Sequence, residues 1–187
     1  MTMTRAPYLT LIQRGSARRV VSPPSSAPDP IIARFPGASS QARDPLCDVA
    51  ARQGLLERLE LVGSLAPSAP LSFIVAKIHG LDELNRTRGF AAGDAALKGI
   101  AATISRYTRA TDLVGRFTGS SFGVVLQGTG ATGAAAVAAR LSHYIAELSC
   151  IGGPVSVTVA AATGRGLNAE VLPMAAIDSL SAESEAR

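Results

Sequence analysis

The sequence predicts an α/β protein of the α+β type, in which a mixed β-sheet of about five strands is covered by helices. Helical and strand-like hydrophobic patterns alternate from residue 44 onward, as expected when helices pack on a sheet. Of the 187 residues, 47% are hydrophobic, which is enough for one core. Six of the eleven prolines fall in residues 1–43. The chain therefore divides into a tail, residues 1–43, and a domain, residues 44–187.

The tail is expected to be disordered and basic. It contains six Arg and one Asp, whereas the rest of the chain carries 12 basic and 13 acidic side chains. It shows no sustained apolar period, so burial cannot offset the entropy of ordering it. Its apolar residues, Val20, Val21 and residues 31–35, are candidates for docking onto a protein partner. Nucleic acid is a poor candidate partner, because only 4% of the residues are aromatic.

Cysteine usage and hydropathy indicate a cytoplasmic protein. Cys47 and Cys150 lack the spacing of zinc ligands or of a disulfide framework. The first ten residues lack the apolar centre of a signal peptide, and no run of about 18 apolar residues is present to cross a bilayer. We therefore expect a reducing compartment and no membrane span.

The first half of the domain contains a helix, a strand and a second helix. Residues 50–65 have apolar side chains at helical spacing and are closed by Gly63 and Pro67. Residues 71–78 form a run of apolar and β-favouring residues, which predicts a buried strand. Residues 94–107 predict a long helix. Its buried face is expected to contain Ala95, Leu97, Ile100, Ala101 and Ile104.

The second half begins with two short strands, residues 112–117 and 122–127. The four residues between them are small or polar, which is typical of a hairpin. An alanine-rich helix over residues 131–148, a strand over 155–162 and a weak helix over 169–180 follow. This order of elements predicts the mixed, helix-covered sheet.

The most informative segment of the chain runs from Arg109 to Phe122. Arg109 stands three residues before Asp112, and a strand and a short polar loop follow. The planar fork of an Arg side chain can bind guanine O6 and N7 or a phosphate, and an Asp can accept hydrogen bonds from guanine N–H groups. The pair is therefore suited to a guanine ligand. An ordinary local salt bridge at the end of a helix is the alternative.

This segment resembles the GGDEF domain, the domain of diguanylate cyclases. In that family an Arg-x-x-Asp inhibitory site, matched here by Arg109 and Asp112, lies five residues before the Gly-Gly-Asp/Glu-Glu-Phe catalytic loop. Further matches in register are Asn85, Gly89, Gly93 and Asp94 of the family's Asn-x-x-x-Gly-x-x-x-Gly-Asp block, and Asp44, Leu46 and Arg52 of its opening motif. The loop itself is degenerate: it reads Thr118, Gly119, Ser120, Ser121 and Phe122.

The resemblance bears directly on catalysis. It implies that Mg²⁺ ligands would stand at two positions occupied here by Lys77 and Ser120. Mg²⁺ requires oxygen ligands, usually carboxylates, and an ammonium group repels the ion. The final helix, near residues 174–180, also lacks the family's pattern. From these substitutions we expect a protein that is not an enzyme, with no catalytic residues, no Mg²⁺ and no cofactor.

Guanine recognition is a separate expectation. By resemblance, Asn85 and Asp94 are possible ligands of a guanine edge, with the carboxylate of Asp94 accepting hydrogen bonds from N–H donors. Both residues also have structural interpretations. Asp94 is a candidate N-cap of the second helix, and Asn85 is a candidate for closing the helical turn before Gly89.

Three functional hypotheses follow. The first is a catalytically inactive GGDEF domain that acts as a cyclic di-GMP receptor through Arg109 and Asp112 in bacterial signalling. The others are a ligand-independent protein-interaction module and a GTP-binding regulatory pseudoenzyme using Asn85 and Asp94. The resemblance implies that a further arginine completes the cyclic di-GMP site and that the ligand favours a homodimer. Candidates for that arginine are Arg88, Arg106 and Arg140, which the sequence does not rank.

Overall fold

The structure is a computed structural model, and it describes residues 43–149 and 155–185. The predicted tail, apart from Arg43, lies outside the described residues, as does Cys150. Arg43 is paired with Ala50 in an isolated antiparallel bridge. Among the described helices, none is long and apolar enough to cross a membrane.

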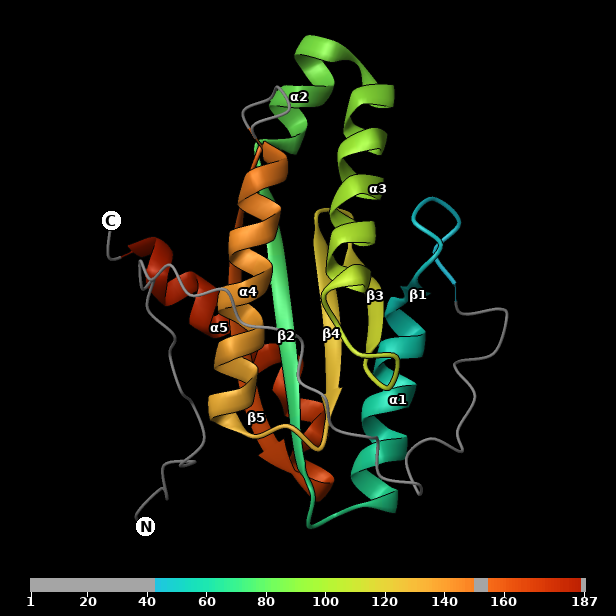
Figure 1. Cartoon of the computed structure of the whole chain (residues 1–187), viewed down its shortest axis with the longest axis vertical. Coiled ribbons are helices and arrows are strands. Elements are labelled where there is room, and N and C mark those ends of the chain that lie inside the picture. The colour runs from blue at the N-terminus through green and yellow to red at the C-terminus, as the bar shows by residue number, and fades with distance from the viewer. Residues whose placement is uncertain (1–42, 150–154, 186–187) are drawn as a thin grey trace.

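A five-stranded mixed sheet forms the centre of the domain (Figure 1), which confirms the predicted fold class. The strand order is β1-β3-β4-β2-β5, with β1 parallel to β3 and the other neighbours antiparallel. The strands are β1 (Ala50–Ala51), β2 (Pro70–His79), β3 (Leu113–Thr118), β4 (Ser121–Gln127) and β5 (Ser156–Arg165).

The helices lie on both faces of this sheet. They are α1 (Arg52–Leu65), α2 (Leu81–Arg88), α3 (Phe90–Arg106), α4 (Ala131–Ser149) and α5 (Leu172–Glu185), with a 3₁₀ helix, η3 (Gly166–Val171), before α5. Alternation along β2 explains the two layers. Ile74 and Ile78 belong to the core under α3 and α4, whereas Phe73 and Val75 belong to the core under α1 and α5. Both faces of β2 are therefore buried.

Two facing glycines bring α1 close to the sheet. Gly115 of β3 and Gly123 of β4 are opposite each other in the ladder. A Cβ at Gly115 would lie 2.7 Å from the Ala50 carbonyl oxygen and from Leu55 Cγ. A Cβ at Gly123 would lie 2.6 Å from Phe73 Cζ and 2.8 Å from Leu55 Cδ1. Leu55, which is fully buried, fills the space that these side chains leave.

The structure corrects several predicted boundaries. The predicted first helix, residues 50–65, begins with the two residues of β1, because Ala50 and Ala51 pair with β3. Helix α2 was not predicted as an element, because its eight residues are too few to show a clear helical repeat of apolar side chains. Helix α3 begins at Phe90 and not at Asp94. The predicted last helix, residues 169–180, begins as η3 and continues as α5.

Candidate functional site

The turn between α3 and β3 holds the first pair of predicted site residues. Helix α3 ends at Arg106, and Tyr107 is its C-cap. The backbone N–H of Asp112 donates to the carbonyl of Arg109 at 3.0 Å, and the backbone N–H of Arg109 donates to Asp112 Oδ2 at 3.0 Å. These two hydrogen bonds close the turn. They join the residues through the backbone of Arg109, so its guanidinium is not needed to hold the turn.

Asp112 is a buried carboxylate with spare hydrogen-bonding capacity. Its Oδ1 is buried and has no hydrogen-bond partner among the described residues. Burial raises the pKa of Asp112, because desolvation disfavours the charged form. The backbone N–H and the charge of Arg109, the backbone N–H of Gln127 and the charge of Arg140 partly oppose this effect. A ligand that donates N–H groups to Oδ1 would satisfy this oxygen and stabilise its ionised form.

Arg140 of α4 is the third charged group at this turn. Its Nη2 donates to the carbonyl of Tyr107 at 2.8 Å, and its Nε is buried with no partner among the described residues. Tyr144, one helical turn later, stacks on Tyr107 with ring centroids 3.7 Å apart. A buried donor and a buried acceptor, Arg140 Nε and Asp112 Oδ1, are thus both unpaired at the same turn.

The three candidate arginines can now be ranked. Arg140 acts electrostatically on Asp112. Arg106 lies over the ring of Tyr107, 5.8 Å from its centroid. Arg88 ends α2, which precedes α3, and is separated from the turn by the length of α3, about 25 Å. Arg140 is therefore the arginine that the fold brings to Asp112.

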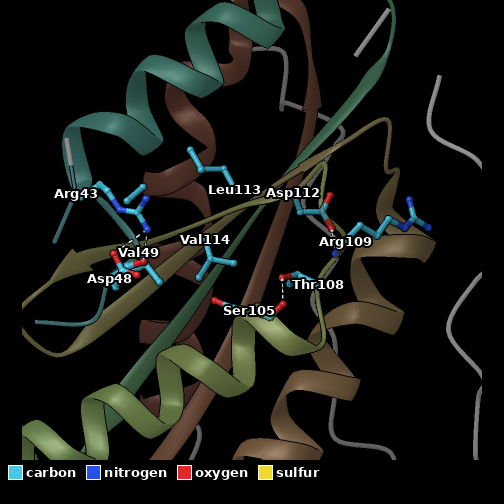
Figure 2. Close-up of a pocket in the computed structure, with 10 residues that line it drawn as sticks. Arg43, Asp48, Val49, Ser105, Thr108, Arg109, Asp112, Leu113 and Val114 are labelled. Carbon is cyan, nitrogen blue, oxygen red and sulfur yellow. Dashed lines mark hydrogen bonds and ion pairs between the residues drawn. The ribbon is translucent and has the colours of Figure 1, made fainter. Parts of the chain in front are cut away.

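A cavity of about 260 Å³ adjoins the turn. Figure 2 shows Arg109 and Asp112 on one side of it and Arg43 and Asp48 on the other. The Arg109 side chain extends away from the other lining residues in this view. Between the two charged pairs the lining is apolar or carries hydroxyl groups: Val49, Ala50, Leu113, Val114, Ser105 and Thr108. Sequence reasoning missed Arg43 and Asp48, because Arg43 was assigned to the tail and neither belongs to a motif.

The loop between β3 and β4, within residues 118–122, is hydrogen-bonded to β2. Lys77 Nζ donates to Ser120 Oγ at 3.1 Å, and the backbone N–H of Ile78 donates to the Ser120 carbonyl at 2.8 Å. The hydroxyls of Thr118 and Ser121 lie 2.6 Å apart. The two predicted metal-ligand positions therefore lie side by side, and their side chains bind each other. In the same loop, Gly119 accepts a hydrogen bond from Arg116, and Phe122 is fully buried in the core.

Asn85 and Asp94 lie at the opposite end of α3 from the Arg109 turn (Figure 1). The main-chain carbonyl of Asn85 accepts the backbone N–H of Gly89 at 2.9 Å, and Gly89, with a φ of 84°, is the C-cap that ends α2. Its side chain occupies the space that a Cβ at Gly93 would need, and its Oδ1 is buried without a partner among the described residues. Asp94 is exposed within α3, so the N-cap interpretation is wrong: Gly89, with φ of 84°, precedes the helix.

The family model described as "Diguanylate cyclase, GGDEF domain" matches residues 41–164. The chain therefore belongs to the GGDEF domain family. This finding confirms the family that the sequence resembles and agrees with the mixed sheet and its helices.

Two curated relatives and one solved structure define the likeness further. The chain is 34% identical over 108 residues to diguanylate cyclase A of Treponema denticola and 28% identical over 107 residues to the probable diguanylate cyclase DgcT of Escherichia coli K12. These matches cover 56% and 57% of this chain but only 29% and 24% of the relatives. The GGDEF domain of DgcB from Caulobacter crescentus, solved in complex with c-di-GMP, superposes with a TM-score of 0.70 at 19% identity, covering 81% of this chain and 92% of that chain. This last likeness shows the fold.

These comparisons correct the prediction that the chain is not an enzyme. The matching family model describes diguanylate cyclases, and both curated relatives are named as such. The prediction was drawn from Lys77, Ser120 and the altered final helix, and these substitutions do not determine whether the folded domain catalyses a reaction. The prediction of a non-enzyme therefore conflicts with the family to which the chain belongs. The expectation that no Mg²⁺ and no cofactor bind stays a prediction.

Proposed function

We propose that this GGDEF domain binds cyclic di-GMP at the Arg109–Asp112 turn and serves as a receptor for that second messenger in bacterial signalling. The observation that carries the proposal is the pair of unpaired buried atoms at this turn, Asp112 Oδ1 and Arg140 Nε. Unsatisfied buried polar atoms are costly, and they are rare in folded proteins outside functional sites.

The chemistry of these groups is complementary to guanine and to phosphate. An ionised Asp112 accepts hydrogen bonds from guanine N–H donors. Arg140 and Arg109 supply N–H donors to guanine O6 and N7 or to phosphate oxygens, and such charge-assisted bonds are about twice as strong as neutral ones. The DgcB domain, which shares the fold, was solved with c-di-GMP, and this supports the choice of ligand.

The cavity accommodates only part of such a ligand. Its volume of about 260 Å³ is below the range of about 300–1,000 Å³ that is usual for enclosed small-molecule pockets. A cyclic dinucleotide bound here therefore projects beyond the cavity toward solvent or toward a second subunit. We include in the proposal a homodimer that the ligand promotes, and a protein partner. Sedimentation with and without cyclic di-GMP tests for the homodimer.

Calorimetric titration with cyclic di-GMP tests the binding function. The wild-type protein should bind with micromolar or better affinity, and Arg109→Ala should bind at least tenfold more weakly, because it loses a charged donor. Arg86→Ala is the matched control, since Arg86 is an exposed arginine of α2 that pairs with Glu83 at 2.6 Å. Absence of micromolar binding by the wild type would remove the proposal in favour of a ligand-independent interaction module.

A second candidate function is guanine nucleotide binding at Asn85 and Asp94. The observation that favours it is Asn85 Oδ1 of α2, a buried acceptor without a partner among the described residues, which lies against Gly93, the residue before the exposed Asp94. Titration with GTP should show binding that Asp94→Ala reduces and Arg109→Ala leaves unchanged. Equal GTP affinity of the wild type and Asp94→Ala would remove this second function.

A further inference from the structure

The wall of the cavity opposite Arg109 is made by the N-terminal loop, residues 43–49. Within it, Arg43 Nη2 donates to the carbonyl of Asp48 at 2.7 Å and lies 2.8 Å from Asp48 Oδ1. Both side chains line the cavity, and Figure 2 shows them across it from Asp112. The cavity is therefore bounded by two acidic and two basic side chains that come from segments about 60 residues apart.

The ion pair in this loop contributes little to the stability of the fold. The side chains of Arg43 and Asp48 are 57% and 90% exposed, and exposed ion pairs stabilise proteins only weakly. Asp48 also has a φ of 52°, and it is the one non-glycine residue with a positive φ in the part of the chain that the structure describes. This conformation is unfavourable for residues with a Cβ, although Asp tolerates it better than most. Arg43 is thus held by a weak and readily exchanged partner.

The rest of the loop is fixed, so Arg43 is presented from a defined position. Asp44 Oδ1 accepts the backbone N–H groups of Leu46 and Cys47, and Asp44 Oδ2 lies 3.5 Å from Arg116 Nη1 of β3. The side chains of Asp44 and Arg116 are only 15% and 20% exposed. The backbone N–H of Asp44 also donates to the carbonyl of Val49 at 2.8 Å. A preorganised loop lowers the entropy that a ligand loses on binding.

We infer that Arg43 is a further ligand-binding residue, which releases Asp48 and binds a phosphate group of the nucleotide held at the Arg109–Asp112 turn. The inference rests on the proposed function and extends it to the opposite wall of the cavity. Because the cavity is too small to enclose a cyclic dinucleotide, part of the ligand reaches the rim, where Arg43 stands. The guanidinium fork matches two phosphate oxygens and retains its charge at any physiological pH.

Asp48 has a defined part in this arrangement. Its carboxylate pairs with the Arg43 guanidinium to which the phosphate would bind, and its negative charge repels the phosphate. Asp48 therefore lowers the affinity for the ligand, because the phosphate must displace it from Arg43. Removing the charge of Asp48 should favour the ligand, but mainly while Arg43 is present to receive the phosphate.

Titration of four proteins with cyclic di-GMP tests the inference: wild type, Arg43→Ala, Asp48→Asn and the double variant. Arg43→Ala should bind about tenfold more weakly, which corresponds to about 1.4 kcal/mol. Asp48→Asn should bind several-fold more tightly, because it removes the negative charge that repels the phosphate. The loop should persist, since Asn keeps a side-chain carbonyl and tolerates a positive φ. In the double variant the gain from Asp48→Asn should disappear, as a double-mutant cycle reveals for residues that act on each other. Arg86→Ala serves as the control for loss of an exposed, paired arginine.

Each outcome separates the inference from the function on which it rests. If Arg109→Ala loses binding while Arg43→Ala binds like the wild type, the role of Arg43 is overturned and the cyclic di-GMP site stands. If Asp48→Asn tightens binding equally with and without Arg43, simple charge repulsion replaces the exchange. If the wild type does not bind, both proposals fall. Thermal unfolding of every variant verifies that the fold is intact, as expected for such exposed side chains.

Discussion

The two ends of α3 carry groups of very different character. At its C-terminal end, Asp112 Oδ1 and Arg140 Nε of α4 are buried without a partner among the described residues, and Asp112 also lines a cavity. At the other end of the helix, Lys77 and Ser120 bind each other, and one buried acceptor, Asn85 Oδ1, has no partner among the described residues. A hydrogen-bonding group is available to a ligand only when the protein does not already use it. Among the described residues, the Arg109 end has two such unpaired buried groups and the other end has one, so a ligand gains more hydrogen bonds at the Arg109 end.

The largest expected effect comes from the carboxylate at that end. Asp112→Asn keeps a carbonyl oxygen to accept the backbone N–H of Arg109, so the turn should persist. The amide lacks the negative charge that strengthens hydrogen bonds from guanine, so cyclic di-GMP affinity should fall by about 30-fold, or about 2 kcal/mol. Calorimetry measures this loss. A variant that binds as tightly as the wild type would show that Asp112 does not face the ligand.

A methyl group at the other end of α3 should act on stability and not on cyclic di-GMP. In Gly93→Ala the new Cβ would overlap the Asn85 side chain, so the free energy of unfolding should fall by about 1–3 kcal/mol. Gly99→Ala on the same helix is the matched control. No atom lies within 4 Å of a Cβ there, and replacing glycine within a helix should stabilise the protein by up to about 1 kcal/mol.

Urea unfolding of both variants measures these changes. If Gly93→Ala is as stable as Gly99→Ala, the packing of Asn85 against Gly93 is wrong. If it alters cyclic di-GMP affinity, the two ends of α3 are not independent.

The pH dependence of binding should report on Asp112. Burial raises its pKa above the ordinary value of 3.8, so in the window from 3.8 up to the raised pKa the folded protein binds more protons than the unfolded chain. Cyclic di-GMP affinity should weaken as pH falls through the raised pKa, because the ligand needs the ionised carboxylate. The contribution of this group to folding stability has the opposite sign: it decreases as pH rises through the same window.

Both trends should be absent from Asp112→Asn, because the amide does not titrate. Calorimetry and urea unfolding between pH 4 and pH 8 compare the variant with the wild type. If the cyclic di-GMP affinities of the wild type and Asp112→Asn change with pH in the same way, another group controls the pH dependence.

The smallest effect is expected at Lys77. Lys77→Met removes one hydrogen bond to the neutral Ser120 hydroxyl and keeps most of the side-chain volume, so stability should change by about 1 kcal/mol or less. Cyclic di-GMP affinity should not change. A large loss of affinity, with the fold intact by circular dichroism, would contradict the separation of the two ends.

Much of the fold follows from local patterns in the sequence. The run of mostly apolar and β-favouring residues from 71 to 78 predicted a buried strand, and β2 is buried on both faces. The predicted helix to residue 107 and strand from residue 112 place Arg109 and Asp112 at the connection between them, where the structure has a turn. Whether that turn binds cyclic di-GMP stays a proposal.

Other features depend on contacts between distant segments and were not predicted. Strand β1 is two residues long and exists because it pairs with β3, more than 60 residues later. The approach of Arg140 to Asp112 and of the N-terminal loop to the cavity likewise depends on how elements pack. Nothing in the residues around position 43 distinguishes an arginine in a tail from one in the wall of a cavity.

The facing glycines of β3 and β4 have a consequence for the ligand site, although neither lines the cavity. They seat Leu55, and through it α1, at a fixed height above the sheet. The N-terminal loop leads directly into β1, and Ala50 of β1 lines the cavity. Ala50 pairs with Gly115, and a Cβ at Gly115 would lie 2.7 Å from the Ala50 carbonyl oxygen, so a side chain there would displace β1. The absence of a side chain at position 115 thus allows one wall of the proposed ligand site to lie where it does.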